Sequence, residues 1–267
     1  MNFKEKYGPV ALVAGASSGL GAAFAHALAA RGLDLVIVAR RKDLLEETAG
    51  EISLKYSVRV IPVTADLADP EAAAQISDAI GQLPIHFLVY NAAASYIGPF
   101  LDLPSESHAK NNRVNTLNPL MMIHRFAGNM IKNKRGGILL MSSLAGLQGS
   151  GYLASYAAGK AFNRILAESL WYEWKPKGVD VMACCAGSIS TQNYLDSNPK
   201  NISALAPKAQ RPEAVVEECL RRIGKTPSFI PGTGNKLAAF FMQHIFPRKK
   251  AIRLISDTTR KMYEITD

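Results

Sequence analysis

Tyr156 and Lys160, in the segment YAAGK, are the residues whose types and spacing best suit chemistry. Residues four apart share one face of a helix, so we expect the phenol and the ammonium to be neighbours. An ordinary tyrosine has a pKa of about 10, and a nearby positive charge favours its ionised form. The pair predicts an acid–base unit. Taken alone, the same spacing also fits plain helix packing.

Ser143 adds a third polar group to this pair. It ends the apolar run 137–143 and lies thirteen residues before Tyr156, which leaves room for a loop ahead of the helix. A hydroxyl at the carboxyl end of a strand can hydrogen-bond the same substrate oxygen as Tyr156. The three side chains together indicate chemistry at a carbonyl or hydroxyl group.

The elements that must position these residues follow a regular alternation of strands and helices. Most of the apolar runs are continuous rather than alternating, which is typical of parallel strands covered on both faces. We therefore predict an α/β fold: a doubly wound parallel sheet of the Rossmann type, with three α/β/α layers in a single domain. The predicted strands are 10–15, 34–40, 59–66, 85–93, 137–143, 179–187 and 228–231, and the predicted helices are 19–31, 41–56, 69–81, 105–134, 152–175 and 211–224.

The first predicted strand leads into AGASSGLG, residues 14–21. Gly15, Gly19 and Gly21 have the spacing G-x3-G-x-G, which differs from the common dinucleotide fingerprint G-x-G-x-x-G. Glycines at a helix start let the backbone approach a phosphate, and Ser17 and Ser18 offer hydroxyl donors. By itself the segment fits a phosphate cradle and an ordinary tight turn equally well.

The end of the second predicted strand distinguishes the two nicotinamide dinucleotides. An NAD site usually has an acidic residue there, whereas this chain has Arg40 and Arg41 and no acid before Asp43. An arginine can bind a 2′-phosphate that a carboxylate would repel. NADP(H) is therefore the preferred cofactor, with NAD(H) as the alternative. Asp66, after the third strand, can either accept from an adenine amine or cap the next helix.

Seven motifs occur in order along nearly the whole chain: AGASSGLG (14–21), Asp66-Leu67, YNAA (90–93), VN (114–115), SSLAG (142–146), YAAGK (156–160) and AGSIST (186–191). In this order they resemble the motifs of the short-chain dehydrogenase/reductase family, in its form of about 250 residues. The resemblance implies hydride transfer between a nicotinamide and a ketone or secondary alcohol.

The resemblance also implies individual roles. Tyr156 would exchange a proton with the substrate oxygen, and Lys160 would lower the pKa of Tyr156 and bind the nicotinamide ribose. Ser143 would orient the carbonyl group, and Asn115 would hold a water in a proton relay to Lys160. The implied cofactor contacts are Gly15, Ser17, Ser18, Gly19, Leu20, Gly21, Arg40, Arg41, Asp66, Leu67, Asn91, Ala92, Ala93, Tyr156, Lys160, Ile189 and Thr191.

Three positions depart from the family pattern. Ala14 replaces a threonine whose hydroxyl braces the glycine loop in the family. Ala93 and Ala186 stand where the family has a glycine and a proline. These changes concern the fit of the cofactor and the rigidity of the loops, because all four catalytic positions are filled.

The composition excludes several other classes. The net charge of +9 suits phosphate ligands, but no recognition motif accompanies it, so no nucleic-acid partner is expected. Five scattered histidines and three cysteines without a CxxC pair predict no metal site and a reducing, cytoplasmic location. We find no signal peptide at the start, and no apolar stretch approaches the roughly 18–20 residues of a membrane span.

Two further segments concern the substrate and the partners. Residues 192–212 are the expected substrate loop, in which Tyr194, Leu195 and Leu205 can either cover a hydrophobic substrate or anchor the loop. The basic tail 235–267 has an apolar stripe that suits packing on a neighbouring subunit better than a membrane surface.

The resemblance implies a homodimer or homotetramer and a small carbonyl or alcohol substrate, with ketoacyl and steroid-like compounds as candidates. The alternative functions are an NADP(H) sensor without turnover and a docking protein that acts through its tail.

Overall fold

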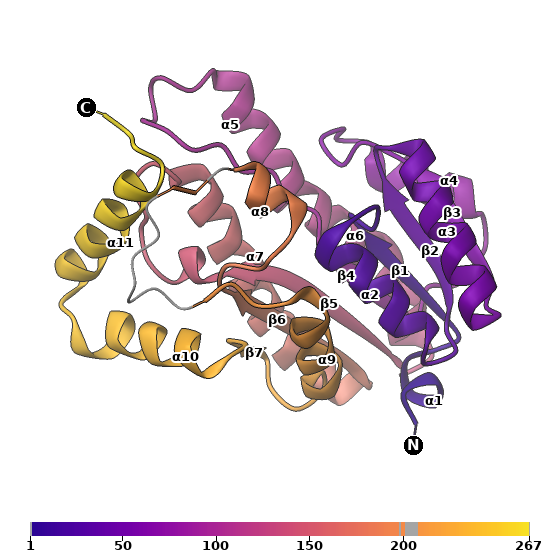
Figure 1. Ribbon diagram of the computed structural model, residues 1–267. Coiled ribbons are helices and arrows are strands. Elements are labelled where there is room, and N and C mark those ends of the chain that lie inside the picture. Colours follow the sequence, from indigo (N-terminus) through magenta and orange to yellow (C-terminus); the bar gives the residue numbers. More distant parts are fainter. Residues whose placement is uncertain (1, 198, 201–207, 267) are drawn as a thin grey trace.

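The computed structural model describes residues 2–197, 199–200 and 208–266, and this part of the chain contains one parallel sheet of seven strands (Figure 1). The strand order is β3-β2-β1-β4-β5-β6-β7. The strands are β1 Val10–Ala14, β2 Asp34–Ala39, β3 Val60–Thr64, β4 Phe87–Tyr90, β5 Gly136–Ser143, β6 Val179–Ala186 and β7 Ser228–Phe229. All seven predicted strands and the doubly wound topology are confirmed.

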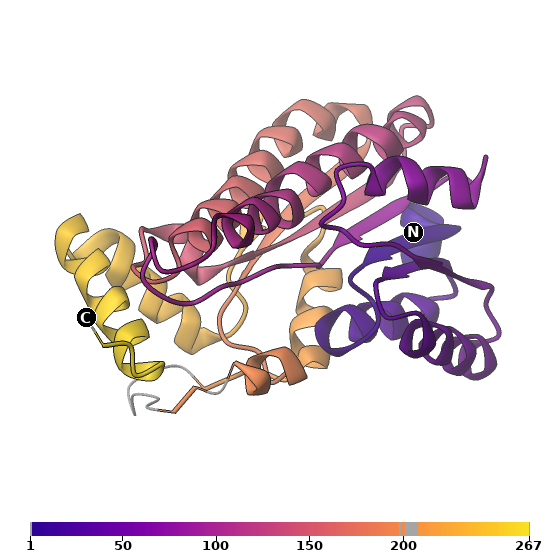
Figure 2. The ribbon, with the colours of Figure 1, turned by 90° about the horizontal axis from the view of Figure 1, so that it is seen from above.

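The helices cover both faces of the sheet (Figure 2). They are α1 Phe3–Tyr7, α2 Gly19–Ala29, α3 Lys42–Tyr56, α4 Ala72–Ile80, α5 Ser105–Asn112, α6 Asn118–Lys132, α7 Ala154–Trp174, α8 Gln192–Asp196, α9 Pro212–Arg222, α10 Thr233–Phe240 and α11 Arg248–Met262. Short 3-10 turns are η2 Leu144–Leu147 and η3 Lys175–Lys177, and π-helical turns are η1 Arg113–Leu117 and η4 Phe241–Ile245. The helix predicted over 105–134 is therefore interrupted by η1.

Side chains that alternate along each strand form two separate cores. In β1, Ala11 and Val13 pack with α2, α3 and α9, whereas Leu12 and Ala14 pack on the other side with α4, α6 and α7. Because successive side chains of a strand point to opposite faces, a strand buried on both faces must be apolar at every position. This explains why the apolar runs of the sequence are continuous.

Strand β1 lies between β2 and β4, and the order of the strands in the sheet reverses at this point. Ala14, the last residue of β1, is paired with Val38 in β2 on one side and with Tyr90 in β4 on the other. The chain leaves β1 and β4 toward opposite faces, which opens a crevice at their carboxyl ends. The loops after β4 and β6 carry α5 and α8 to this end of the sheet (Figure 1).

At the opposite end of the sheet, one buried carboxylate accepts hydrogen bonds from neighbouring elements. Asp180 in β6 is 3% exposed and accepts hydrogen bonds from Tyr7 Oη at 2.8 Å, Lys6 Nζ at 2.6 Å and Lys175 Nζ at 2.7 Å. Burial alone would raise the pKa of Asp180, but the bonds from Lys175, Lys6 and Tyr7 together hold it below its ordinary value. The cluster joins α1 and η3 to the sheet.

No helix among the described residues is long and apolar enough to cross a membrane. Within the same residues, no group of three histidine, cysteine or acidic side chains is arranged to hold a metal ion. Cys184, Cys185 and Cys219 are free and buried.

Candidate active site

The glycine loop after β1 is braced by backbone contacts. The amides of Gly15 and Ala16 donate to the Val38 carbonyl at 2.8 and 3.1 Å. The carbonyl of Ala14 accepts from the amides of Asn91 and Ala92 at 3.1 and 3.0 Å. These bonds, together with one from the Asn91 side chain to the Gly15 carbonyl at 3.1 Å, hold the loop without the hydroxyl that Ala14 lacks.

The start of α2 presses directly against this loop. A Cβ on Gly21 would lie 1.8 Å from the Gly15 carbonyl oxygen, so a side chain at this position would push the helix away. Gly15 and Gly19 have φ values of +83° and +56°, which favour glycine. Ser18, the N-cap residue, makes no side-chain bond to the helix. The first-turn amides of α2 are therefore available to a phosphate, and the residues present fit a dinucleotide.

Arg41 reaches back over the glycine loop. Its Nη2 donates to Ser18 Oγ at 2.8 Å and to Ser17 Oγ at 3.2 Å. Arg40 is directed elsewhere: its Nε lies 4.0 Å from the Asp66 carboxylate, and both side chains are largely exposed. Of the two arginines, Arg41 therefore forms the more defined cluster of anion-binding donors.

The other residues predicted to contact the cofactor lie around the same crevice, but they differ in whether their side chains are accessible to a ligand. The side chains of Leu20 and Leu67 are buried in the two cores, so these residues can meet a ligand only through their backbone. Asp66 accepts from the Ala68 amide at 3.0 Å in a local turn, and it does not cap the next helix, because the N-cap residue of α4 is Glu71. Ala93 is exposed beside the Asn91 turn.

Ile189 and Thr191 bring the segment after β6 over the crevice. Ile189 forms a bridge with Gln210, and a Cβ on Gly19 would lie 3.0 Å from the Thr191 methyl carbon. Thr191 therefore lies directly above the start of α2. Two segments more than 150 residues apart in sequence thus enclose the predicted phosphate position.

Ser143 and Tyr156 meet at the carboxyl end of β5. Ser143 ends the strand, and its Oγ accepts from the Ala145 amide at 3.2 Å where the chain turns into η2. The Tyr156 and Ser143 hydroxyls share a hydrogen bond. Burial raises the pKa of Tyr156, the bond with Ser143 acts in the opposite direction, and nearby Tyr263 raises the pKa further. The phenol therefore remains protonated at neutral pH.

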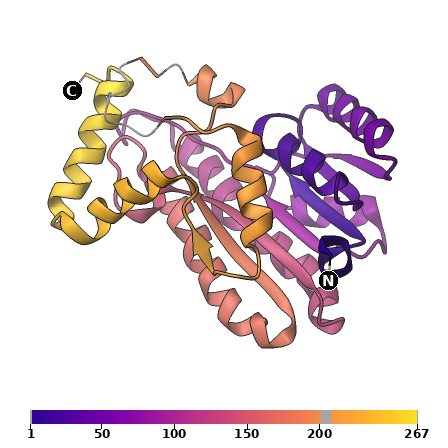
Figure 3. The same ribbon diagram turned by 60° about the horizontal axis from the view of Figure 1, so that its bottom comes forward.

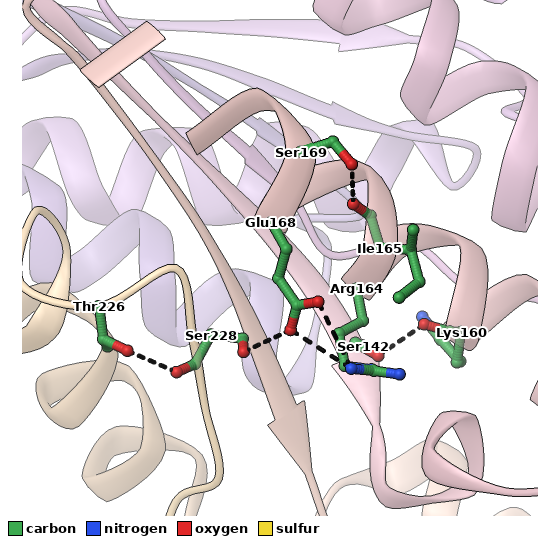
Figure 4. Close-up of polar contacts among 8 residues, drawn as sticks. All are labelled: Ser142, Lys160, Arg164, Ile165, Glu168, Ser169, Thr226 and Ser228. Carbon is green, nitrogen blue, oxygen red and sulfur yellow. Dashed lines mark hydrogen bonds and ion pairs between the residues drawn. The ribbon is translucent and has the colours of Figure 1, made fainter. Parts of the chain in front are cut away.

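Lys160 connects α7 to β5 through two hydrogen bonds. Its Nζ donates to the Met141 carbonyl at 2.8 Å. Its own carbonyl accepts from the Ser142 hydroxyl at 2.7 Å, as Figure 4 shows. The side chain is 3% exposed, and burial lowers its pKa to about 8. Nζ lies 5.6 Å from the centre of the Tyr156 ring. Burial has the largest effect on the pKa of Tyr156 in this arrangement, and the lowering of that pKa by Lys160, implied by the family resemblance, stays a prediction.

A second polar chain extends along α7 toward β7 (Figure 4). Glu168 accepts from Arg164 at 3.3 Å and from the Ser228 hydroxyl at 2.7 Å. These bonds fix the middle of α7 to the edge strand. The helix that carries Tyr156 and Lys160 is therefore tied to the sheet at several points along its length.

Asn115 lies in the π-helical turn η1 and is completely buried. Its Oδ1 accepts from the Ala94 amide at 3.2 Å, and its Nδ2 donates to the Ala94 carbonyl at 2.7 Å and to Asn111 Oδ1 at 3.0 Å. A Cβ on Gly159 would lie 2.8 Å from Asn115 Cβ, so the backbone of α7 packs directly against the Asn115 side chain. Asn115 therefore connects the turn after β4 to the helix bearing Lys160.

The far side of the site is closed by the end of α11. The Ser197 hydroxyl donates to the Tyr194 carbonyl at 2.7 Å and shares a hydrogen bond of 3.2 Å with Tyr263 Oη. The Lys200 amide donates to the Met262 carbonyl at 3.0 Å. The described part of the predicted substrate loop is thus pinned to the tail, and Tyr263 approaches Tyr156.

Two further residues of the predicted substrate loop are Leu195 and Leu205. Leu195 is 61% exposed, and Leu205 lies outside the described residues.

Sequence reasoning missed three residues of this site. Asn111 is buried, lies four residues before Asn115 and also donates to the Ala94 carbonyl at 3.0 Å. Asn118 donates to the Leu67 carbonyl at 2.9 Å and so fixes the turn after β3. The spacing of the asparagines was a usable signal, because positions three and four apart share a helix face. No local signal pointed to Tyr263.

Comparisons with known proteins agree with this geometry. The family model for short chain dehydrogenase matches residues 9–202. A 7beta-hydroxysteroid dehydrogenase from Collinsella aerofaciens is 34% identical over 238 residues, which are 88% of this chain and 90% of that protein. A solved structure from a study of 7beta-hydroxysteroid dehydrogenase stereoselectivity has a TM-score of 0.90 at 33% identity, covering 96% of this chain and 99% of that one.

A short-chain dehydrogenase from Sphingobium yanoikuyae, solved in complex with NADPH, has a TM-score of 0.76 at 27% identity, covering 84% of this chain and 88% of that one. The family model spans β1 to β6 and the segment that contains Ser143, Tyr156, Lys160 and Thr191. The chain belongs to the short chain dehydrogenase family and is an oxidoreductase that acts on CH–OH groups with NAD(P).

Proposed function

We propose that the protein interconverts a bulky hydrophobic ketone and its secondary alcohol with NADP(H), and that ketone reduction is its working direction. The observation that carries this proposal is the meeting of Ser143, Tyr156 and buried Lys160 at the carboxyl end of β5, beside the glycine loop. The relative from Collinsella aerofaciens supports a steroid-like substrate, with ketoacyl compounds as the alternative.

The chain's own residues would act on the proton and the carbonyl group. Ser143 would hold the carbonyl oxygen by a hydrogen bond, and Tyr156 would donate its proton to that oxygen as charge develops there. The bound nicotinamide supplies the hydride. Lys160, with a pKa of about 8, would keep a positive charge near the phenol at neutral pH.

The protonation of Tyr156 supports the direction of reaction. A raised pKa keeps the phenol in its acid form, which is the form that a ketone reduction consumes. Oxidation of an alcohol instead needs the phenolate, which becomes more abundant as the pH rises. We therefore expect reduction to be favoured at neutral pH and oxidation to gain at alkaline pH.

The proposed reaction can be tested with a substrate panel. Ketosteroids, 3-oxoacyl thioesters and small ketones would each be mixed with NADPH or NADH, and turnover followed by the nicotinamide absorbance. We expect NADPH oxidation with at least one bulky ketone and slower turnover of small ketones. Turnover confined to small polar carbonyl compounds would contradict the proposed substrate class.

Arg41→Ala is expected to weaken NADPH binding about tenfold to a hundredfold, because charge-assisted hydrogen bonds contribute roughly 1.5–3 kcal/mol. NADH binding should change less than about threefold, since NADH lacks the 2′-phosphate. Dissociation constants from cofactor fluorescence would measure both. Arg40→Ala is the matched control, and its effect should be smaller because Arg40 faces Asp66. Equal loss for both cofactors in Arg41→Ala would exclude recognition of the 2′-phosphate.

A further inference from the structure

The segment 233–262, here called the tail hairpin, consists of α10, η4 and α11. Figures 1 and 3 show it at the periphery beyond β7, on the side away from α2 and α3. Its inner side is anchored to the domain. Asn235 Nδ2 donates to Gln210 Oε1 at 2.9 Å, and Arg248 donates to the Leu147 carbonyl at 3.1 Å. The hairpin therefore has a fixed base and a free outer side.

The outer side carries an apolar stripe formed by Leu237, Phe240, Phe241 and Ile245. These side chains are 41–59% exposed. With Leu254 they make five of the thirteen exposed large apolar side chains of the described residues, within a segment of thirty residues. Phe240 and Phe241 contact each other with ring centres 6.0 Å apart, and the Phe240 ring lies 5.3 Å from that of His244, which precedes Ile245. An exposed apolar cluster of this kind marks an interaction surface.

The stripe is accompanied by an excess of positive charge. Residues 236–253 contain five basic side chains and no acidic one: Lys236, Arg248, Lys249, Lys250 and Arg253. Lys250 Nζ lies 4.8 Å from the centre of the Phe246 ring, which places a cation beside an aromatic ring at the turn of the hairpin. Among the described residues, Lys249, Lys250 and Arg253 have no ion-pair partner. Their charge is therefore available to an anionic partner.

We propose that the tail hairpin docks on the surface of an anionic lipid bilayer. The apolar stripe would enter the boundary between headgroups and acyl chains, and Lys249, Lys250 and Arg253 would contact anionic headgroups. A bilayer offers both an apolar layer and negative charge in one plane, which is the combination that this outer side complements. The stripe and these three cations are not among the residues placed in the active site, so vesicle binding can be measured without turnover.

A second copy of the chain is a poorer occupant of this surface. A two-fold contact places the same patch of both subunits face to face. Lys249, Lys250 and Arg253 of one hairpin would then meet the same cations of the other, and Asp257 is the one acidic residue of 233–262. Like charges brought together in this way oppose association. The charge distribution therefore favours a lipid surface over self-association through the hairpin, in contrast to the subunit packing that the sequence alone favoured for the tail.

The test is cosedimentation of the full chain with vesicles. We expect binding to mixed phosphatidylglycerol–phosphatidylcholine vesicles, weak binding to pure phosphatidylcholine, and release by added salt. Lys249→Glu combined with Lys250→Glu should lower the partition coefficient at least about tenfold. Phe240→Ser combined with Ile245→Ser should lower it by a similar factor, because the apolar contribution is lost.

Matched controls separate local docking from a general charge effect. Lys55→Glu combined with Lys177→Glu makes the same charge change at exposed sites outside the hairpin. Leu54→Ser removes an apolar side chain that is 88% exposed on α3. Both controls should bind vesicles like the unchanged protein, and thermal unfolding would establish that every variant is folded.

Three results would overturn the proposal. The first is a failure of the unchanged protein to bind anionic vesicles. The second is an equal loss of binding in the control with Lys55 and Lys177 reversed, which would mean that net charge alone attracts the protein. The third is the absence of vesicle binding together with a lower oligomeric mass of the Phe240→Ser/Ile245→Ser variant in ultracentrifugation. That combination would make the stripe an interface between copies.

Discussion

Tyr156→Phe is expected to lower kcat for ketone reduction by about a thousandfold, since a positioned general acid contributes roughly 10²–10⁴ in rate. The substitution removes only the hydroxyl that bonds with Ser143, and the ring keeps its place on α7. NADPH binding should therefore be retained within about threefold. Steady-state kinetics and a fluorescence titration of NADPH measure the two effects separately.

The same helix offers a control for this substitution. Tyr172 also lies on α7 and is 78% exposed, so Tyr172→Phe should leave both kcat and NADPH binding unchanged. A turnover rate of Tyr156→Phe close to that of the unchanged protein would remove Tyr156 from its proposed role. A parallel loss of NADPH binding would instead point to a distorted crevice.

Asp180→Asn is expected to cost about 2–3 kcal/mol of folding free energy and to leave the crevice intact. The carboxylate is buried, and three donors from α1 and η3 depend on it. Loss of its charge weakens hydrogen bonds that are each stronger than neutral ones. For a chain of this size we expect Tm to fall by roughly 5–10 °C, as measured by thermal unfolding.

The pH dependence gives this prediction a second readout. Because the pKa of Asp180 is lowered in the fold, its contribution is present above its ordinary value of about 4 and is lost as the pH falls through the lowered value. The stability gap between the unchanged protein and Asp180→Asn should therefore shrink in acid. Asp78→Asn is the control, since Asp78 is 79% exposed and only 3.9 Å from Arg125. An equal loss in both variants would contradict the special role of the buried carboxylate.

The sheet and the crevice could be predicted because their signals are local. A strand covered on both faces must be apolar at every position, and the polar residue that ends it, such as Ser143, stands out against the run. The spacing of Tyr156 and Lys160 is likewise set by one helix. The structure brings the glycine loop, the Asn91 turn and these three residues to one end of the sheet, where the sequence analysis expected them.

The rest of the site depends on contacts between distant segments. Tyr263 shares a hydrogen bond with Ser197 and approaches Tyr156, which lies more than a hundred residues earlier in the chain. No pattern of apolar and polar residues in the sequence predicts either contact. The choice between Arg40 and Arg41 depends on which guanidinium turns toward the serines of the loop. The π-helical turn at Asn115 depends on the packing of α7 against α5 and α6. Such features follow from tertiary packing, which overrides local propensity.

The contact at Gly159 limits how the site can vary. A side chain at this position would collide with the side chain of Asn115, so the close approach of α7 to Asn115 requires glycine beside Lys160. Exchanges of side chains in the substrate loop or along α11 leave this contact untouched and can reshape what the crevice accepts. A variant with a new substrate range can therefore arise through the loops, while Gly159 has to stay without a side chain.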